Sequence, residues 1–132
     1  MVASMKKMIV IAILCLVFVG ILGSVASAGN LDWKTTEVYE EIGSIYVKGY
    51  FTNNMPNKVV NKINWFQPNL TVTLADDSTI FLDETADYKQ DCWIEPGGRS
   101  NIMWFRIAGT NMEWVRWHVN PKYNYHTIVP KG

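Results

Sequence analysis

The sequence predicts an all-β protein, with about seven short strands packed as a β-sandwich behind an N-terminal signal peptide. Three observations lead to this expectation. Residues 70–82 alternate apolar and polar side chains on both sides of an Asp-Asp-Ser turn, which is the pattern of a hairpin of half-buried strands. Turn signals recur at intervals of about ten residues. No segment after residue 28 carries the apolar stripe of a helix.

The first 28 residues have the three parts of a secretory signal peptide. Lys6 and Lys7 make the start basic, residues 8–22 are an apolar run, and Ala26-Ser27-Ala28 supplies small residues before a cleavage point. We therefore expect cleavage after Ala28, a mature domain of residues 29–132, and a secreted, periplasmic or cell-envelope location. The alternative is an uncleaved membrane anchor, since the apolar run is almost long enough to span a bilayer.

Composition narrows the possible functions. The whole chain has 12 basic and 12 acidic residues, and loss of Lys6 and Lys7 leaves the mature domain with 10 against 12, a net charge near −2. No basic run stands out, so nucleic acid is not an expected partner. Cys92 is the single cysteine after residue 28, which excludes an internal disulfide. We interpret Cys92 as a small buried hydrophobic residue rather than a reactive thiol.

The first half of the domain predicts three strands before the hairpin of residues 70–82. One lies within residues 30–41, and the next spans residues 44–53, where β-branched and aromatic residues alternate faces. Gly49 inside this strand suggests a bulge or a close contact with another backbone. Asn and Pro in residues 53–58 mark a turn. A strand from residue 59 or 60 to 66 then meets a bend at Pro68, so it and the first hairpin strand form one long kinked strand or two.

The second half predicts shorter strands. The acidic residues 83–91 read as a crossing loop, and strands follow at residues 92–95, 100–107, 113–119 and 123–129, with turns at Pro96-Gly97-Gly98 and Pro121 between them. Strict alternation assigns the inner face of the sandwich. The predicted core is Val47, Phe51, Leu70, Val72, Leu74, Met103, Phe105 and Ile107.

Three motifs carry a resemblance to a known family. Residues 47–53 (Val-Lys-Gly-Tyr-Phe-Thr-Asn), residues 70–76 (Leu-Thr-Val-Thr-Leu-Ala-Asp), and residues 95–98 (Glu-Pro-Gly-Gly) followed by Met103 and Phe105 are similar to the FxLYD-like group of bacterial extracytoplasmic domains. The resemblance covers residues 44–107. It implies a single immunoglobulin-like β-sandwich that serves as an accessory or binding domain, and it implies no catalytic residues.

Catalytic and metal-binding patterns are weak. No nucleophile motif occurs, and His118 and His126, the two histidines, lack the spacing of a metalloprotease helix. An enzyme alternative, a small secreted hydrolase, would need His118 paired with an acid such as Glu113. The acids of residues 83–91 fit no calcium loop and are interpreted as solvated charges. We therefore expect no cofactor, no metal and no enzymatic activity.

Tryptophan is the unusual feature of the second half. If alternation holds, Trp93, Trp104 and Trp114 lie on the outer faces of their strands, and Arg106, Arg116 and His118 share that side. Arg and Trp on neighbouring strands can form cation–π pairs, and both residue types are enriched in interfaces. The alternative is that Tyr123 and Tyr125 of the last segment cover this surface.

These observations predict a non-catalytic binding module. The expected binding residues are Trp93, Trp104, Arg106, Trp114, Arg116 and His118. Aromatic planes can stack on sugar rings as readily as on protein side chains, so the expected partner is another envelope protein, a cell-wall glycan or a second copy of the domain. A membrane is expected as a partner only through the signal segment, if that segment is not cleaved.

Overall fold

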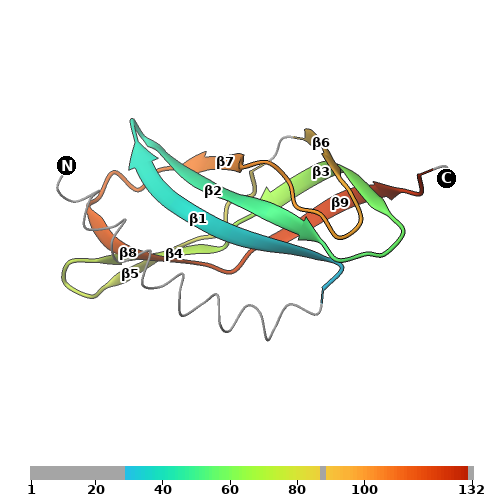
Figure 1. Cartoon of the computed structure of the whole chain (residues 1–132). Helices are drawn as coiled ribbons and strands as arrows, with labels where there is room; N and C mark the ends of the chain where they lie inside the picture. Colours follow the sequence, from blue (N-terminus) through green and yellow to red (C-terminus); the bar gives the residue numbers. More distant parts are fainter. Residues whose placement is uncertain (1–28, 87–88, 131–132) are drawn as a thin grey trace.

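The computed structural model describes residues 29–86 and 89–130, and within them it contains nine β-strands in three antiparallel sheets and no helix (Figure 1). The all-β prediction is therefore confirmed. No helix of the described residues is long and apolar enough to cross a membrane. The predicted signal peptide, residues 1–28, lies outside the described residues.

The first layer is the sheet β1-β2-β7, made of β1 (Leu31–Glu41), β2 (Ser44–Asn53) and β7 (Met103–Ala108). β2 pairs with β7 without a register shift, so alternation assigns their faces correctly. β1 has one bulge between Thr35 and Glu37, opposite Gly49. A Cβ atom on Gly49 would collide with the carbonyl oxygen of Lys34 and the ring of Trp33, which confirms the predicted close contact at this glycine.

The second layer consists of two small sheets that continue one another behind the first layer (Figure 1). The order β6-β3-β9 joins β6 (Gln90–Ile94), β3 (Val59–Gln67) and β9 (Lys122–Ile128), and the order β5-β4-β8 joins β5 (Thr79–Leu82), β4 (Leu70–Leu74) and β8 (Trp114–Val119). Two prolines, Pro68 and Pro121, interrupt this layer at the same level. The backbone N–H of Asn120 donates to the carbonyl of Pro68 at 3.1 Å.

These interruptions explain why the described residues form nine strands where the sequence predicts about seven. Pro68 and Asn69 separate β3 from β4, and Asn120 and Pro121 separate β8 from β9, because proline has no N–H to donate to a sheet. If each kinked pair is counted as one strand, the structure has the predicted seven.

An aromatic cluster joins the two layers. The rings of Phe66 from β3 and Phe105 from β7 stack with centroids 4.2 Å apart. Trp33 from β1 packs against Phe51, Phe66 and Phe105 at 4.8, 4.7 and 5.6 Å. Buried residues of all three sheets belong to one hydrophobic cluster, so the domain has a single core.

Seven of the eight predicted core residues are buried, and Leu74 is the exception. Leu74 packs against the core but stays partly exposed, because it closes the β4–β5 turn instead of lying under the opposite sheet. Its N–H donates to the carbonyl of Ser78 at 2.8 Å, and its carbonyl accepts from the N–H of Asp77 at 3.0 Å. The prediction of a fully buried Leu74 is therefore wrong.

Candidate interaction face

The six predicted binding residues are not on one face. Trp104 and Arg106 lie on β7 in the first layer, Trp93 lies on β6, and the other three lie on β8. Each of these strands belongs to a different sheet. The predicted continuous surface of tryptophan and arginine is therefore absent, and Trp104 and Arg106 remain as its largest intact part.

Trp114 corrects the sequence prediction most clearly. The register between β4 and β8 shifts, so that Thr73 lies opposite Arg116 but Leu74 lies opposite Trp114, and Val115 is an extra residue. This bulge turns the indole of Trp114 inward, where only 3% of the residue is exposed. Its Nε1–H donates to Oε1 of Glu40 at 2.9 Å. Trp114 is a core residue, and the prediction that it lies outside is wrong.

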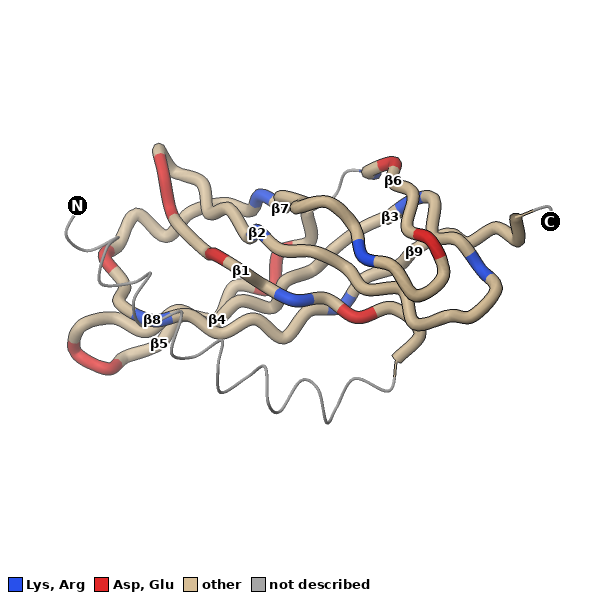
Figure 2. Tube along the Cα trace, in the orientation of Figure 1, with Lys and Arg blue, Asp and Glu red and all other residues tan. Residues whose placement is uncertain are grey.

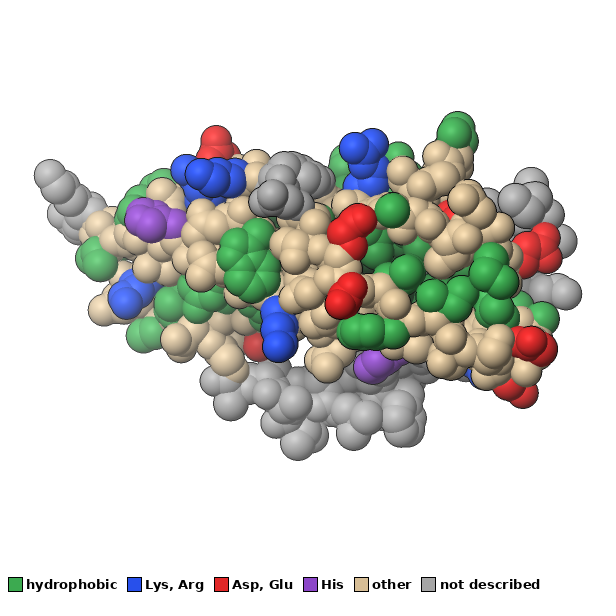
Figure 3. Space-filling view, turned by 180° about the vertical axis from the view of Figure 1, so that it is seen from behind, with side chains coloured by type: hydrophobic (Ala, Val, Ile, Leu, Met, Phe, Trp, Pro, Cys, Tyr) green, Lys and Arg blue, Asp and Glu red, His purple; other side chains and the backbone are tan. Residues whose placement is uncertain are grey.

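Trp93 is exposed on β6, and Arg116 and His118 are exposed together on the outer side of β8, in a different sheet. The indole N–H of Trp93 donates to Glu95 at 2.8 Å, and Arg116 forms a 3.2 Å ion pair with Asp77 at the β4–β5 turn. Both histidines are visible on the surface of the second layer, where hydrophobic and charged side chains are interspersed (Figure 3). No carboxylate of the described residues lies within ion-pair distance of His118.

The outer side of the first layer gathers aromatic and basic side chains in three cross-strand rows. Lys34 lies opposite Tyr50, Lys48 lies between Glu37 and Trp104, and Tyr46 lies between Tyr39 and Arg106. Arg99, from the turn before β7, reaches the same side. We call this surface the aromatic–cation face, and it comprises Lys34, Glu37, Tyr39, Tyr46, Lys48, Tyr50, Arg99, Trp104 and Arg106.

Cations and rings pair on this face. The Arg99 guanidinium lies 4.7 Å from the centroid of the Tyr50 ring, and the Lys48 ammonium lies 5.6 Å from that of Trp104. Tyr39 and Tyr46 stack at 5.2 Å with an interplanar angle of 21°. Trp104 remains 54% exposed. The face therefore offers an accessible indole flanked by positive charge.

Several contacts fix these side chains in place. Lys48 forms an ion pair with Glu37 at 3.1 Å. The turn that carries Arg99 is fastened to the end of β2, since Gly97 N–H donates to Asn53 and Ser100 N–H donates to Phe51, both at 2.8 Å. Desolvation raises the pKa of Tyr39 above its ordinary value, and the nearby Lys48 ammonium acts in the opposite direction.

Side chains from the second layer cover the outer edge of β7. Nε2 of Gln90 donates to the backbone carbonyl of Trp104 at 2.8 Å, and the carboxylate of Glu84 accepts from the N–H of Ala108, with Oε2 at 3.0 Å. An edge strand normally presents unpaired backbone groups to other chains. These two side chains occupy such groups on β7, so the face, and not the edge, is the accessible part of this strand.

The sequence contained most of the signals for this face. Alternation placed Tyr46, Lys48 and Tyr50 opposite the core face of residues 44–53, and it placed Trp104 and Arg106 together. It did not show that β2 and β7 are neighbours. Arg99 was missed because it lies in a turn, where no periodicity indicates the direction of a side chain.

The described residues contain no group of three or more His, Cys, Asp or Glu side chains that could hold a metal ion. Two of the acidic residues in the segment 83–91 lie next to other groups of the protein instead of lying together. Glu84 binds the β7 backbone, and Asp91 lies opposite Lys62 in the β3–β6 pairing. Figure 2 shows acidic and basic residues distributed along the trace of the described residues. The arrangement suits non-covalent binding through rings and charges.

No protein-family model matches this chain, and no curated protein matches it. Among solved structures, it is similar to the crystal structure of a DUF1425 family member from Shewanella sp. pv-4. The two share 14% identity, and the match covers 70% of this chain and 76% of that chain with a TM-score of 0.38. A similarity of this size supports no inference about function, and the resemblance to the FxLYD-like group stays a prediction.

Proposed function

We propose that this protein is an exported, non-catalytic binding module that holds its partner on the aromatic–cation face. The observation that carries the proposal is the exposed indole of Trp104, which lies beside Lys48 and Arg106 on a strand that pairs with β2 in regular register. Large aromatic residues and arginine dominate the energetics of protein surfaces that bind partners. A face fixed by cross-strand contacts also loses little conformational entropy on binding.

A catalytic function has less support. The hydrolase alternative requires His118 to act with an acid, and Glu113 is the acid that the sequence suggested. His118 is exposed on β8, and the described residues place no carboxylate within ion-pair distance of it. These observations favour binding over hydrolysis for this protein.

Export is supported by the N-terminal sequence. Residues 1–28 have the basic start, apolar centre and small-residue end of a signal peptide, so the mature form would begin at Gly29. Mass spectrometry of the accumulated protein tests this directly. An intact Met1 or a lipid on Cys15 would contradict it, and the face would then be presented by an anchored domain.

The partner classes are an envelope protein, a cell-wall glycan and a second copy of the domain. Indole N–H signals of the six tryptophans in a two-dimensional NMR spectrum can be followed while glycans are added, and light scattering detects self-association. We expect the Trp104 signal to shift first. The variant Trp104→Ala should abolish the interaction, whereas Trp93→Ala, which removes a similarly exposed indole from β6, should leave it intact.

Two results would contradict the proposal. One is an interaction that persists unchanged in Trp104→Ala, which would place the binding surface elsewhere. The other is the absence of any shift at Trp104 with glycans, with candidate envelope proteins and at high protein concentration. In that case the cation–π pairs of the face serve only stability.

A further inference from the structure

We propose that the aromatic–cation face binds an acidic polysaccharide, with sugar rings stacked on Trp104 and sugar carboxylates held by the surrounding basic side chains. This inference rests on the proposed function and names the ligand class. Its three supports are the exposed indole, the basic side chains around it and the regular pairing of β2 with β7.

The indole provides the platform for a sugar ring. Trp104 is 54% exposed and lies on the outer side of β7, where its neighbours across the sheet are polar or basic. The face of an indole carries partial negative charge, and it attracts the partially positive C–H groups on the flat side of a sugar ring. The open outer side of a sheet accommodates such a ring without a pocket.

The charge of the face differs from that of the domain. Lys34, Lys48, Arg99 and Arg106 lie on it with one carboxylate, that of Glu37, and two more acids, Asp32 and Glu41, lie on the same side near the ends of β1. The predicted mature domain has only 10 basic residues and a net charge near −2. Of these four cations, only Lys48 forms an ion pair with a carboxylate of the described residues. Arginine matches a carboxylate with two parallel N–H donors, so Arg99 and Arg106 suit a ligand that carries carboxylates.

The spacing of the rows suits a polymer. Residues on one face of a strand are about 7 Å apart, because two rises of about 3.4 Å separate them. Arg106 follows Trp104 on the same side of β7, and Lys48 faces Trp104 from β2. A chain of acidic sugars lying along β2 and β7 would therefore meet basic side chains beside the indole and again one row further on.

Other ligands use only part of this arrangement. A neutral glycan would stack on Trp104 but leave the cations without partners. An acidic peptide would satisfy the cations but has no ring for the indole, and it could not extend the sheet at β7, because Gln90 and Glu84 already bind that edge. A chain that carries both rings and carboxylates can stack on Trp104 and bind the basic side chains at the same time.

Three probes of equal length separate these ligands: hexagalacturonate carries rings and charge, cellohexaose carries rings alone, and hexaglutamate carries charge alone. Binding is measured by NMR titration of the protein in the form that cells accumulate. We expect hexagalacturonate to bind at least roughly tenfold more tightly than either of the others, a difference of about 1.4 kcal/mol. Its affinity should fall steeply when the salt concentration rises to about 0.5 M, since salt screens exposed charges.

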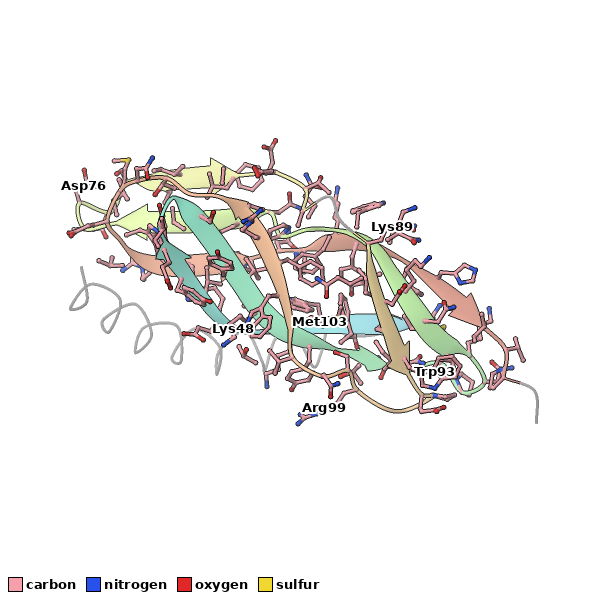
Figure 4. All side chains as sticks on the ribbon, turned by 90° about the horizontal axis from the view of Figure 1, so that it is seen from above. Lys48, Asp76, Lys89, Trp93, Arg99 and Met103 are labelled. Atoms are coloured by element: carbon pink, nitrogen blue, oxygen red, sulfur yellow. The ribbon has the colours of Figure 1, made fainter. Side chains whose placement is uncertain are left out.

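Substitutions locate the site. Trp104→Ala should abolish hexagalacturonate binding, and Lys48→Met and Arg106→Gln should each weaken it several-fold. Lys122→Met is the matched control, because Lys122 is exposed on β9 in the second layer, whereas Figure 4 shows Lys48 and Arg99 on the same side of the molecule. It should bind as the unmodified protein does. Urea unfolding of each variant checks that the fold is intact, and the shifts of the unmodified protein map the site independently of any variant.

The outcomes distinguish this inference from the proposed function. Equal affinity for cellohexaose, or for hexaglutamate, would overturn the acidic-polysaccharide assignment while leaving a binding face at Trp104. Loss of affinity in Lys122→Met equal to that in Lys48→Met would also overturn it, since attraction would then be general. Failure of all three probes to shift Trp104 overturns the inference, and the proposed function falls with it only if self-association and protein partners fail as well.

Discussion

β7 and β8 have similar sequences but use their tryptophans in opposite ways. Met103 to Arg106 reads Met-Trp-Phe-Arg, and Trp114 to Trp117 reads Trp-Val-Arg-Trp. In β7 the pairing with β2 is regular, so Trp104 lies outside and Phe105 inside. In β8 the extra residue Val115 breaks the pairing with β4, and both Trp114 and Trp117 lie inside.

A single unpaired residue therefore determines which tryptophan side chains are exposed to a binding partner. Side chains alternate with a period of two, so a single inserted residue moves everything on one side of it to the other face. Glu40 then stabilises the result, since its carboxylate accepts from Trp114 Nε1–H at 2.9 Å, from the Thr110 hydroxyl at 2.9 Å and from the Asn111 N–H at 2.8 Å. Because of the bulge and the carboxylate of Glu40, Trp114 is buried, although strict alternation would place it on the outer side of β8.

The largest expected loss of stability follows from replacing Trp114, which tests whether its side chain lies in the core. Trp114→Ala should lower the free energy of unfolding by about 3–5 kcal/mol, because it removes a large buried side chain. Trp104→Ala should lower it by no more than about 1 kcal/mol, the range of an exposed cation–π pair. Urea unfolding followed by circular dichroism measures both. Equal losses would mean that β7 and β8 do not differ as described.

The carboxylate of Glu40 should have the next largest effect. Glu40→Ala leaves the buried indole N–H of Trp114 without an acceptor and should lower the free energy of unfolding by about 1–3 kcal/mol. Glu37→Ala is the matched control on the same strand. Its ion pair with Lys48 is partly exposed, and its loss should cost at most about 1 kcal/mol. A smaller effect for Glu40→Ala than for Glu37→Ala would contradict this role.

Deletion of Val115 tests the role of the bulge directly. Without this residue, Trp114, Trp117 and Val119 would still lie on one side of β8 and Arg116 and His118 on the other, now by regular alternation. We therefore expect the deletion to cost only about 1 kcal/mol, a typical value for a single change, and to leave iodide quenching of the protein's tryptophan fluorescence unchanged, because Trp114 stays buried. An unfolded or strongly quenched protein would show that the bulge itself is required.

The smallest effect concerns Tyr123, on the strand that continues β8. Its hydroxyl donates to the carbonyl of Leu31 at 2.5 Å, and burial raises the pKa of Tyr123 to about 12. The unfolded chain releases this proton near its ordinary pKa of about 10, so stability should fall as the pH rises from about 10 to 12. Tyr123→Phe should lose about 1 kcal/mol near neutral pH but show a shallower alkaline decrease in Tm. Parallel alkaline curves would rule out Tyr123 as a source of the decrease.

Much of the fold could be predicted because it depends on local periodicity. The strands of residues 44–53 and 103–108 alternate without interruption, so their inner faces and the side of Trp104 and Arg106 follow from the sequence. Pro68 and Pro121 marked the places where the second layer breaks, because proline cannot donate to a sheet. The tight fit at Gly49 was also visible, since a strand glycine indicates a close backbone.

The tertiary structure decided which strands are neighbours and where the register slips. Sequence alternation cannot show that Lys48 lies opposite Trp104, that Arg99 rests on Tyr50, or that Val115 is unpaired, since each of these depends on a partner strand distant in the chain. The reason is physical: a strand's own residues fix its two faces, but cross-strand contacts, bulges and turn positions are chosen by packing of the whole core. The sequence therefore indicates which side chains of each strand point outward, but only the pairing of β1, β2 and β7 brings them together as the aromatic–cation face.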